Sequence, residues 1–213
     1  ELAPGLAEAY AIRAAYLELA GDFGAAETMF ETAIRLDPDR HQSYRNYATY
    51  LYRLGEFERA AEYFEKAIEL DPEDRNSLST LPQIYRSLGQ NSKMLEANAR
   101  MLAAEERHLE LNPDDARSRL LTAFSFLELG QREQAFERAA QILDSGTNDS
   151  LMLYNIGCFY AVAGDIDASL DALERSVAAG NVQPDWWRQD SDLDNVRDDP
   201  RFEELLKRME ASS

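Results

Sequence analysis

The stretch YRNYATYLYRLGEFERAAEYFEKAIELDPED, residues 44–74, contains the pattern that decides the fold. In its first half, large and small apolar side chains recur at i, i+3, i+4 and i+7, at Tyr44, Tyr47, Ala48 and Leu51. This spacing places them on one face of a helix. Gly55 follows, and glycine readily adopts the left-handed conformation found just past helix ends. The first half therefore predicts a helix that closes at Gly55.

A second helix is predicted from about residue 56 to residue 70 of the same stretch. Ala60, Phe64 and Ala67 form one stripe along it at helical spacing. The dipeptide Asp71-Pro72 ends this helix, because proline disfavours the helical conformation at the residue before it. The stretch is thus a pair of helices joined by a tight turn, and its small residues let the two helices approach closely.

The same pattern returns along the chain. Glycines recur at 21, 55, 89, 130 and 164, in steps of 34, 34, 41 and 34 residues. Self-similarity at a fixed period in this range indicates stacked structural repeats. We therefore expect five repeats within residues 1–179, at about 7–40, 41–74, 75–115, 116–149 and 150–179, followed by a C-terminal helical cap at 180–213.

These residues resemble the tetratricopeptide-repeat family, in which a large residue, a small Ala, then Gly, Ala, Phe, Ala and Pro recur with this period. The match is weakest in the third repeat, where Pro82 replaces the usual Ala and Met94 and Asn98 replace Ala and Phe. In the fourth repeat, the segment 145–147 replaces the Asp-Pro closure. The resemblance implies an all-α fold, a right-handed α–α superhelix whose first helices line a concave groove. It also implies non-catalytic protein–protein interaction.

Seven extra residues lengthen the third repeat, within a predicted helix over 92–111. Seven residues are close to two helical turns, so the helix can lengthen with little change of direction. Leu95, Leu102 and Leu109 then lie at heptad spacing. We expect the end of this helix to project beyond its neighbours. We favour an overhang that packs on the adjacent repeat over a lip that binds a partner or a second protomer.

The pattern changes after Ala179, where the cap is expected. Asp199 before Pro200 marks a helix start, with proline at the first helical position. A stack of repeats needs a cap because its last repeat would otherwise expose its open side to water. We expect Trp186 and Trp187 to help cover that side. The end of the chain also resembles the ends of bacterial tetratricopeptide-repeat regions, some of them attached to protein kinases or nucleotide cyclases.

The chain is strongly acidic, with a formal net charge of −18 over 213 residues. This charge argues against partners such as nucleic acid and anionic membrane surfaces, and no apolar run is long enough for a transmembrane helix. The basic residues are almost all arginine, and a lysine-poor acidic surface suits solubility at high salt. An ordinary acidic bacterial protein is the alternative interpretation.

Glu1 is not a start methionine, and the stretch that follows has no signal-peptide pattern, so we expect a segment of a longer polypeptide. Cys158 is the single cysteine of the chain, so the sequence contains no disulfide framework, and a cytoplasmic location is expected. Cys158 falls within a predicted first helix, where we expect a small buried or groove-lining thiol.

Asp190, Asp192 and Asp194 imitate the start of a calcium-binding loop. However, Asn195 and Arg201 occupy the places where such a loop requires glycine and glutamate, so helix capping and a solvated turn are the preferred interpretation. The two histidines, at 41 and 108, lie in different repeats without a second ligand at metal spacing. We therefore predict no catalytic residue, no metal site and no cofactor.

The inner wall of the predicted groove is the candidate site. Side chains on the first helices that point away from the packing face should line it. The candidates are Gln42, Arg45, Asn46, Thr49, Tyr52, Arg53, Asn76, Ser79, Gln83, Arg86, Arg117, Leu120 and Phe124. Tyr154, Asn155 and Cys158 continue this path in the fifth repeat.

Arginines predominate among the charged residues of this path, although the chain is acidic. An arginine fork binds a carboxylate through two parallel hydrogen bonds. We therefore hypothesise a peptide partner with an acidic or C-terminal carboxylate segment, lying across repeats two to four with an apolar side chain on Phe124. The alternative is that the arginines pair with neighbouring carboxylates of the protein itself.

Two functions remain open at the level of sequence. One is a non-catalytic interaction scaffold, monomeric or weakly dimeric. The other is a regulatory module of a larger signalling enzyme, a kinase or nucleotide cyclase, whose catalytic domain lies upstream of Glu1. The sequence identifies neither the partner nor the pathway.

Overall fold

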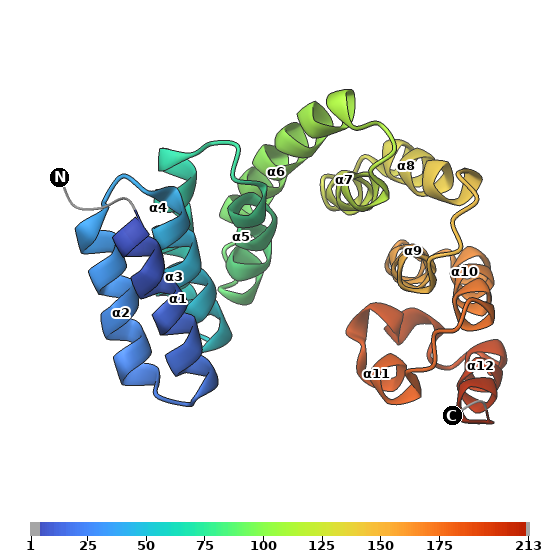
Figure 1. Cartoon of the computed structure of the whole chain (residues 1–213). Coiled ribbons are helices and arrows are strands. Elements are labelled where there is room, and N and C mark those ends of the chain that lie inside the picture. Colours follow the sequence, from blue (N-terminus) through green and yellow to red (C-terminus); the bar gives the residue numbers. More distant parts are fainter. Residues whose placement is uncertain (1–4, 212–213) are drawn as a thin grey trace. The chain divides into compact units, whose positions relative to one another are not determined.

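Paired helices account for nearly all of the computed structural model, which describes residues 5–211 (Figure 1). No strand occurs within that range. The helices are α1 (Gly5–Leu19), α2 (Phe23–Leu36), α3 (His41–Arg53), α4 (Phe57–Leu70), α5 (Arg75–Ser87), α6 (Asn91–Leu111), α7 (Ala116–Glu128), α8 (Arg132–Asp144), α9 (Ser150–Val162), α10 (Ile166–Ala178), α11 (Pro184–Gln189) and α12 (Pro200–Ala211), with a 3₁₀ helix η1 (Ser191–Val196) before α12.

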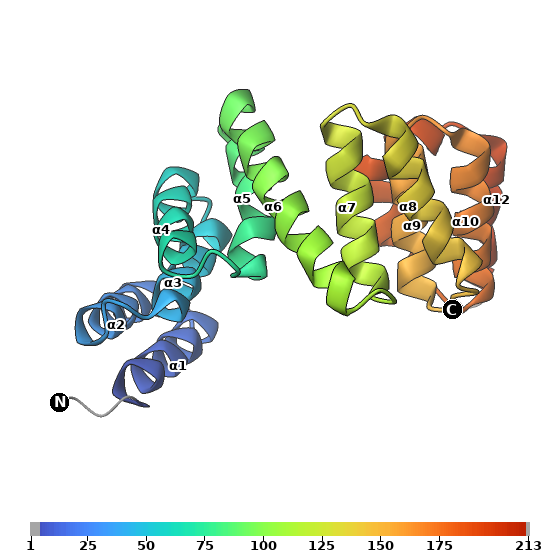
Figure 2. The ribbon, with the colours of Figure 1, turned by 90° about the horizontal axis from the view of Figure 1, so that it is seen from above.

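The chain divides into two compact units, Glu1–Ala104 and Glu105–Ser213, here called unit 1 and unit 2. Within each unit, consecutive helices lie side by side, as α7 with α8 and α9 with α10 in unit 2 (Figure 2). The boundary falls inside α6, so this lengthened helix begins in one unit and ends in the other. The sequence pattern did not indicate this division.

A buried residue, Ala or Gly in four of the repeats and Pro in the third, stands at the same register position in each first helix. These residues are Ala14, Ala48, Pro82, Ala123 and Gly157, and all are buried. At Gly157 the approach is closest, because a Cβ added there would lie 2.6 Å from Cγ and Cδ2 of Leu173 in α10. The Leu173 side chain lies against the Gly157 backbone, so this position requires the smallest side chain.

Aromatic side chains fill the space between repeats in unit 1. The ring centroid of Phe30 in α2 lies 5.7 Å from that of Tyr47 and 5.2 Å from that of Tyr50, both in α3. The buried Tyr50 hydroxyl donates a 2.7 Å hydrogen bond to the carbonyl oxygen of Phe23. This bond satisfies a polar group that burial would otherwise penalise.

The long helix α6 contacts the core of unit 1 through Met94 and Met101, which share one heptad position. Met94 and Met101 belong to the unit 1 core, whereas Leu95 is exposed. In unit 2, Glu106 accepts hydrogen bonds of 2.9 and 2.7 Å from Arg138 of α8. The extension therefore contacts the next repeat, as favoured from the sequence, while Leu111 at its end is exposed.

The C-terminal cap covers the end of unit 2 through one tryptophan. Trp187 is fully buried between Tyr154 and Phe202, with ring centroids 5.2 and 6.2 Å away. Trp186 is 57% exposed, so the expectation that both tryptophans cover this side was wrong for Trp186. Adjacent residues of a short helix point in different directions, and only one of them can face the core. The predicted helix start at Pro200 is confirmed.

Arginine–carboxylate pairs connect the outer helices, which are the even-numbered helices from α2 to α12. In each pair, an arginine on one outer helix contacts a glutamate on the outer helix before it. The pairs are Arg59 with Glu27, Arg100 with Glu65, Arg138 with Glu106 and Arg208 with Glu174, at N–O distances of 2.6 to 2.9 Å. Exposed pairs of this kind each contribute little stability, but their planar geometry favours one register of stacking.

Substitution Gly157→Ala should destabilise unit 2. Alanine is normally the better helix former by about 1 kcal/mol, but here its Cβ would collide with Leu173. We expect a net loss of about 1–3 kcal/mol in the free energy of unfolding, measured by urea denaturation. Gly24→Ala is the matched control, because a Cβ at Gly24 meets nothing within 4 Å. Equal effects of the two substitutions would contradict the close approach.

The Glu27 carboxylate should make the free energy of unfolding depend on pH in the acidic range. Hydrogen bonds from Arg59 and from Tyr47 hold the pKa of Glu27 below its ordinary value of 4.5. Because the folded state lowers this pKa, the stabilisation is complete above pH 4.5 and is lost as pH falls through the folded-state value. Glu27→Gln should flatten this part of the stability–pH profile in thermal unfolding. An unchanged slope would contradict the assignment.

Candidate functional site

A groove in unit 1 lies between α1 and α3. Its volume is about 440 Å³, and it is lined by Glu8, Ala11, Ile12, Ala15, Phe30, Arg40, Gln42, Ser43, Arg45, Asn46, Thr49 and Arg53. Five of the residues predicted from the sequence therefore share one groove, at positions 42, 45, 46, 49 and 53. The remaining wall comes from the first repeat, which the prediction did not include.

The helical period explains the α3 side of this groove. Arg45, Asn46 and Thr49 follow one another at i, i+1 and i+4, on the side of α3 away from the buried Tyr47 and Leu51. On α1, alanines stand at 11 and 15 on the facing side. Their short side chains leave the hollow open. Alignment of α1 with the first helices of the later repeats would have identified these α1 residues from the sequence.

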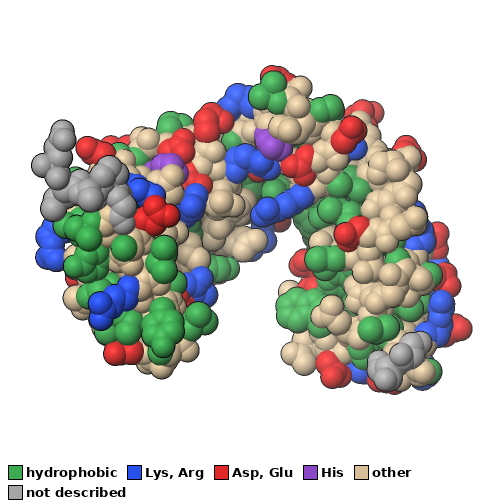
Figure 3. Space-filling model, viewed as in Figure 1, with side chains coloured by type: hydrophobic (Ala, Val, Ile, Leu, Met, Phe, Trp, Pro, Cys, Tyr) green, Lys and Arg blue, Asp and Glu red, His purple; other side chains and the backbone are tan. Residues whose placement is uncertain are grey.

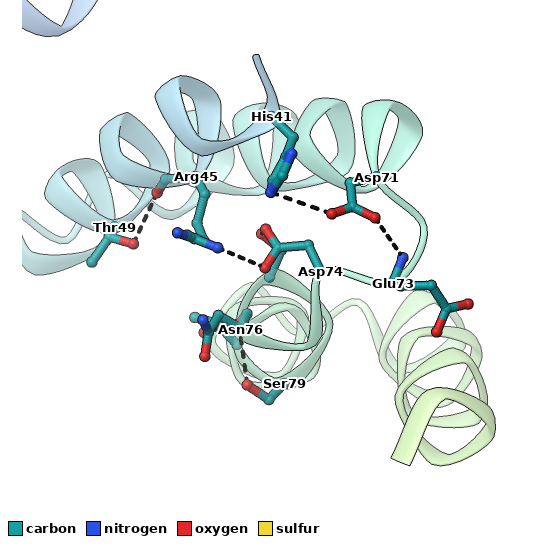
Figure 4. Close-up of polar contacts among 10 residues, drawn as sticks. His41, Arg45, Thr49, Asp71, Glu73, Asp74, Asn76 and Ser79 are labelled. Atoms are coloured by element: carbon teal, nitrogen blue, oxygen red, sulfur yellow. Dashed lines mark hydrogen bonds and ion pairs between the residues drawn. The ribbon is translucent and has the colours of Figure 1, made fainter. Parts of the chain in front are cut away.

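Arg45 is held by the buried carboxylate of Asp74, the residue just before α5 (Figure 4). Its Nη1 donates a 2.9 Å hydrogen bond to Oδ1 of Asp74, whose side chain is only 2% exposed. The other carboxylate oxygen of Asp74 accepts a 2.7 Å hydrogen bond from the Ser77 hydroxyl. Thr49 donates a hydrogen bond to the Arg45 carbonyl oxygen. Arg45 is therefore positioned by its partners, with part of its guanidinium left at the groove.

The other two groove arginines are paired as well. Arg40 lies 3.3 Å from Glu8 across the groove. Arg53 donates from both Nε and Nη2 to the two carboxylate oxygens of Glu18. The alternative weighed from the sequence, pairing with neighbouring carboxylates, is thus confirmed for Arg45 and Arg53.

The charged residues that line this groove are mainly arginines. Its lining contains three arginines and one carboxylate, Glu8. The Asp74 and Glu18 side chains that balance Arg45 and Arg53 are 2% and 14% exposed and do not line the groove. A guanidinium has five N–H donors, so a pair with one carboxylate leaves donors for a ligand.

The other predicted residues lie outside this groove. In unit 1, the Tyr52 hydroxyl donates a 3.4 Å hydrogen bond to Oε1 of Gln83. The side chain of Asn76 is exposed, and the backbone carbonyl oxygen of Asn76 accepts a hydrogen bond from the Ser79 hydroxyl. Arg86 lies exposed in the last turn of α5. These residues continue the α3 and α5 surface of the same unit.

Three predicted residues belong to unit 2. Arg117 is exposed, whereas Leu120 is buried in the core. Phe124 is half-buried and packs edge-on against Phe159, with ring centroids 5.4 Å apart. The expected apolar patch is therefore partly a core contact.

The cap covers the groove positions of the fifth repeat. Tyr154 and Cys158 are buried in a cluster with Trp187, Leu193 and Val196. The Tyr154 hydroxyl donates to the Asp190 carboxylate. The expectation that Tyr154 lines an open groove was wrong, because the chain folds back over α9. Of the two expectations for Cys158, a buried thiol is confirmed and a groove-lining one was wrong.

The remaining polar motifs have structural partners. Asp190 accepts a hydrogen bond from the backbone N–H of Asp192, which caps η1, as the capping interpretation expected. His41 lies 3.3 Å from Asp71, and Nε2 of His108 lies 2.8 Å from Oδ2 of Asp115. Burial raises the pKa of the Cys158 thiol, which disfavours the reactive thiolate.

A helix long and apolar enough to cross a bilayer is not found between residues 5 and 211.

Comparison with known sequences agrees with the repeat pattern. A family model described as tetratricopeptide repeat matches residues 13–75. A chloroplastic protein from Arabidopsis thaliana is 31% identical over 96 residues, which are 44% of this chain and 29% of that protein. The match thus spans less than a third of the length of this relative.

Solved structures show the same fold. PilW, a type IV pilus biogenesis factor, aligns with a TM-score of 0.67 at 15% identity, covering 98% of this chain and 94% of its own. A thermophilic tetratricopeptide-repeat protein from Thermus thermophilus aligns with a TM-score of 0.58 at 18% identity, covering 94% and 99%. YrrB aligns with a TM-score of 0.55 at 20% identity, covering 80% and 84%. The tetratricopeptide-repeat model thus covers residues 13–75, and the solved structures show the all-α superhelical fold predicted.

Loss of Arg45 should destabilise unit 1, because it leaves the buried Asp74 carboxylate without its charged partner. We expect Arg45→Ala to lower the free energy of unfolding by about 1–3 kcal/mol in urea denaturation. The added substitution Asp74→Asn should restore part of the loss by removing the buried charge.

Arg35→Ala is the control for this experiment. Arg35 makes a single 3.0 Å side-chain contact, to Thr32, at an exposed position. Its loss should change stability by no more than about 0.5 kcal/mol. Equal losses for Arg35→Ala and Arg45→Ala would mean that the Arg45–Asp74 pair does not stabilise the unit.

Proposed function

We propose that this protein is a non-catalytic scaffold that binds an acidic or C-terminal segment of a partner protein in the groove between α1 and α3. Tetratricopeptide-repeat domains bind protein partners, which supports the general role. The proposal adds the place and the chemistry of the ligand. It rests on one observation, the arginine-lined groove of an otherwise acidic chain.

The charge of the groove is opposite to that of the protein. The chain has 22 basic and 40 acidic residues, yet three of the four charged residues that line the groove are arginines. The net charge of −18 repels acidic ligands at long range. Hydrogen-bond donors of the groove must therefore select such ligands at short range. Arg40, Arg45 and Arg53 provide planar forks that match a carboxylate.

The uncharged lining suits an extended peptide. Gln42, Asn46 and Thr49 have side-chain groups that can bond to a peptide backbone. The exposed Ile12 supplies an apolar surface on the same groove, beneath which Phe30 is buried. This mixture of oriented polar groups and apolar surface is typical of sites that bind small ligands and peptide segments.

The fold has a precedent for peptide binding. The YrrB structure is described as a tetratricopeptide-repeat protein with an unusual peptide-binding site. That description applies to YrrB and supports the proposal for this chain by analogy of fold alone.

The proposed ligand lies within unit 1. Sequence analysis suggested a peptide across repeats two to four, whereas the groove joins the first and second repeats. Asn76, Ser79, Gln83 and Arg86 on α5 are the residues onto which a longer ligand would extend within the same unit. Arg117 and Phe124 remain candidates for a separate contact in unit 2.

A peptide-pool experiment tests the ligand class. The probe is a fluorescein-labelled pool of random heptapeptides with fixed glutamates and a free C-terminal carboxylate, measured by fluorescence anisotropy. The comparison pool has glutamines in place of the glutamates and an amidated C-terminus. We expect binding of the acidic pool to be stronger by about tenfold or more, as expected for hydrogen bonds to charged groups. Equal binding of the two pools, or none, would overturn the proposal.

Charge reversal then locates the site. Arg40→Glu with Arg53→Glu should weaken binding of the acidic pool by about tenfold or more, because it removes donors and adds repulsion. Arg13→Glu with Arg35→Glu makes the same change in charge at residues that do not line the groove. This control should bind nearly as the unaltered protein does. Equal weakening in both variants would show a general charge effect and contradict the assigned groove.

A further inference from the structure

The arginine-lined groove has an apolar wall on α1. This wall consists of Ala11, Ile12 and Ala15, and Phe30 is buried beneath it. Figure 3 shows hydrophobic side chains at the surface of unit 1, where α1 lies. The groove volume of about 440 Å³ is typical of sites that enclose a small ligand. Arginines do not account for this wall, because a carboxylate gains nothing from apolar surface.

The repeat register explains why the groove is open at this wall. Ala11 and Ala15 correspond to pairs of residues in the later first helices, at steps of 34, 34, 41 and 34 residues. Those pairs are Arg45 with Thr49, Ser79 with Gln83, Leu120 with Phe124, and Tyr154 with Cys158. Of the five repeats, the first is therefore the one with alanine at both positions. Because each alanine side chain is a single methyl group, the wall leaves room for a side chain of a ligand.

The fifth repeat shows what these positions hold when they are occupied. There, Tyr154 and Cys158 share a buried cluster with Trp187, which comes from the C-terminal segment of the chain. The ring centroids of Trp187 and Tyr154 lie 5.2 Å apart. The carboxylate of Asp190 accepts a hydrogen bond from the Tyr154 hydroxyl. One short segment thus supplies both a bulky apolar side chain and a carboxylate to this repeat.

The groove of unit 1 has a place for each of these two groups. The apolar wall lies on α1, whereas Arg45 and Arg53 lie on α3. Each arginine is held by a carboxylate that contributes little surface, with Asp74 2% exposed and Glu18 14% exposed. The guanidinium groups are therefore positioned before a ligand binds. Because little has to be ordered on binding, the groove can select for the spacing of two groups in the ligand.

We propose that the groove selects partner segments in which a bulky apolar side chain lies three residues before an acidic one, as Trp187 does before Asp190. The apolar side chain packs on Ala11 and Ala15, and the carboxylate binds the arginines of α3. This inference rests on the proposed function, to which it adds an apolar anchor and two specificity-determining alanines. Burial of the anchor provides affinity that the net charge of −18 does not oppose.

A set of fluorescein-labelled heptapeptides tests this ligand class by fluorescence anisotropy. The first peptide has tryptophan three residues before aspartate, with glycine and serine elsewhere and an amidated C-terminus. Glycine replaces the tryptophan in the second peptide, and asparagine replaces the aspartate in the third. We expect the first peptide to bind about tenfold or more tightly than the second, because an aromatic side chain is buried. It should also bind about tenfold more tightly than the third, because the third lacks the charged acceptor.

Enlarging Ala15 locates the apolar anchor. Ala15→Leu fills the space at the wall, so it should weaken binding of the tryptophan–aspartate peptide by about tenfold and leave the glycine peptide nearly unchanged. Ala9→Leu is the matched control, because Ala9 is also an exposed alanine of α1 but does not line the groove. This control should bind all three peptides as the unaltered protein does. Both substitutions are at exposed positions, so both variants should fold, which circular dichroism checks.

The outcomes separate this inference from the proposed function. Equal binding of the tryptophan–aspartate and glycine peptides, both tighter than the asparagine peptide, overturns the apolar anchor and leaves the acidic ligand intact. A preference for tryptophan that Ala15→Leu does not reduce, or that Ala9→Leu reduces equally, overturns the assigned wall. Equal binding of the aspartate and asparagine peptides overturns the proposed function and this inference with it. Failure of all three peptides to bind overturns this inference, and the random acidic pool then decides the proposed function alone.

Discussion

Close approach of the two helices within each repeat is the constraint on which the rest of the structure depends. It needs a small residue on the first helix, and the chain supplies Ala or Gly in four of the five repeats, from Ala14 to Gly157, with Pro82 in the third. Once two backbones lie this close, large side chains such as Phe30 and Tyr50 must project between repeats, where they become the core. Small residues at the crossing and aromatic residues at the junction are two consequences of the same packing.

Arginine has two roles in this protein, distinguished by what lies behind the side chain. On the outer helices, residues such as Arg59 and Arg138 reach the carboxylate of a neighbouring helix and fix the stacking register. In the groove, Arg45 is held from behind by the buried Asp74, which leaves its other donors facing the hollow. A buried counter-charge thus both orients the cation and keeps it from collapsing onto surface carboxylates.

The two ends of the repeat series are finished differently. At the C-terminal end, Trp187 and the segment after it fold over α9, and Tyr154 anchors them through Asp190. The C-terminal segment of the chain therefore covers the groove positions of the fifth repeat. At the N-terminal end, Tyr16 stands where every later repeat buries a residue, and it is exposed. The arginine-lined groove and the exposed Tyr16 both belong to unit 1.

The helix pairs, their turns and the resemblance to tetratricopeptide repeats were predictable from the sequence, because they follow from local spacing. The 34-residue period, the turn glycines and the Asp-Pro endings act within one repeat. Only the tertiary structure decided which polar groups meet. Arg45 pairs with Asp74, 29 residues away, and Tyr154 with Asp190, 36 residues away. In a chain with 40 carboxylates, helical periodicity shows which side chains face the groove, but the pairing of each arginine depends on distances between repeats that no local pattern encodes.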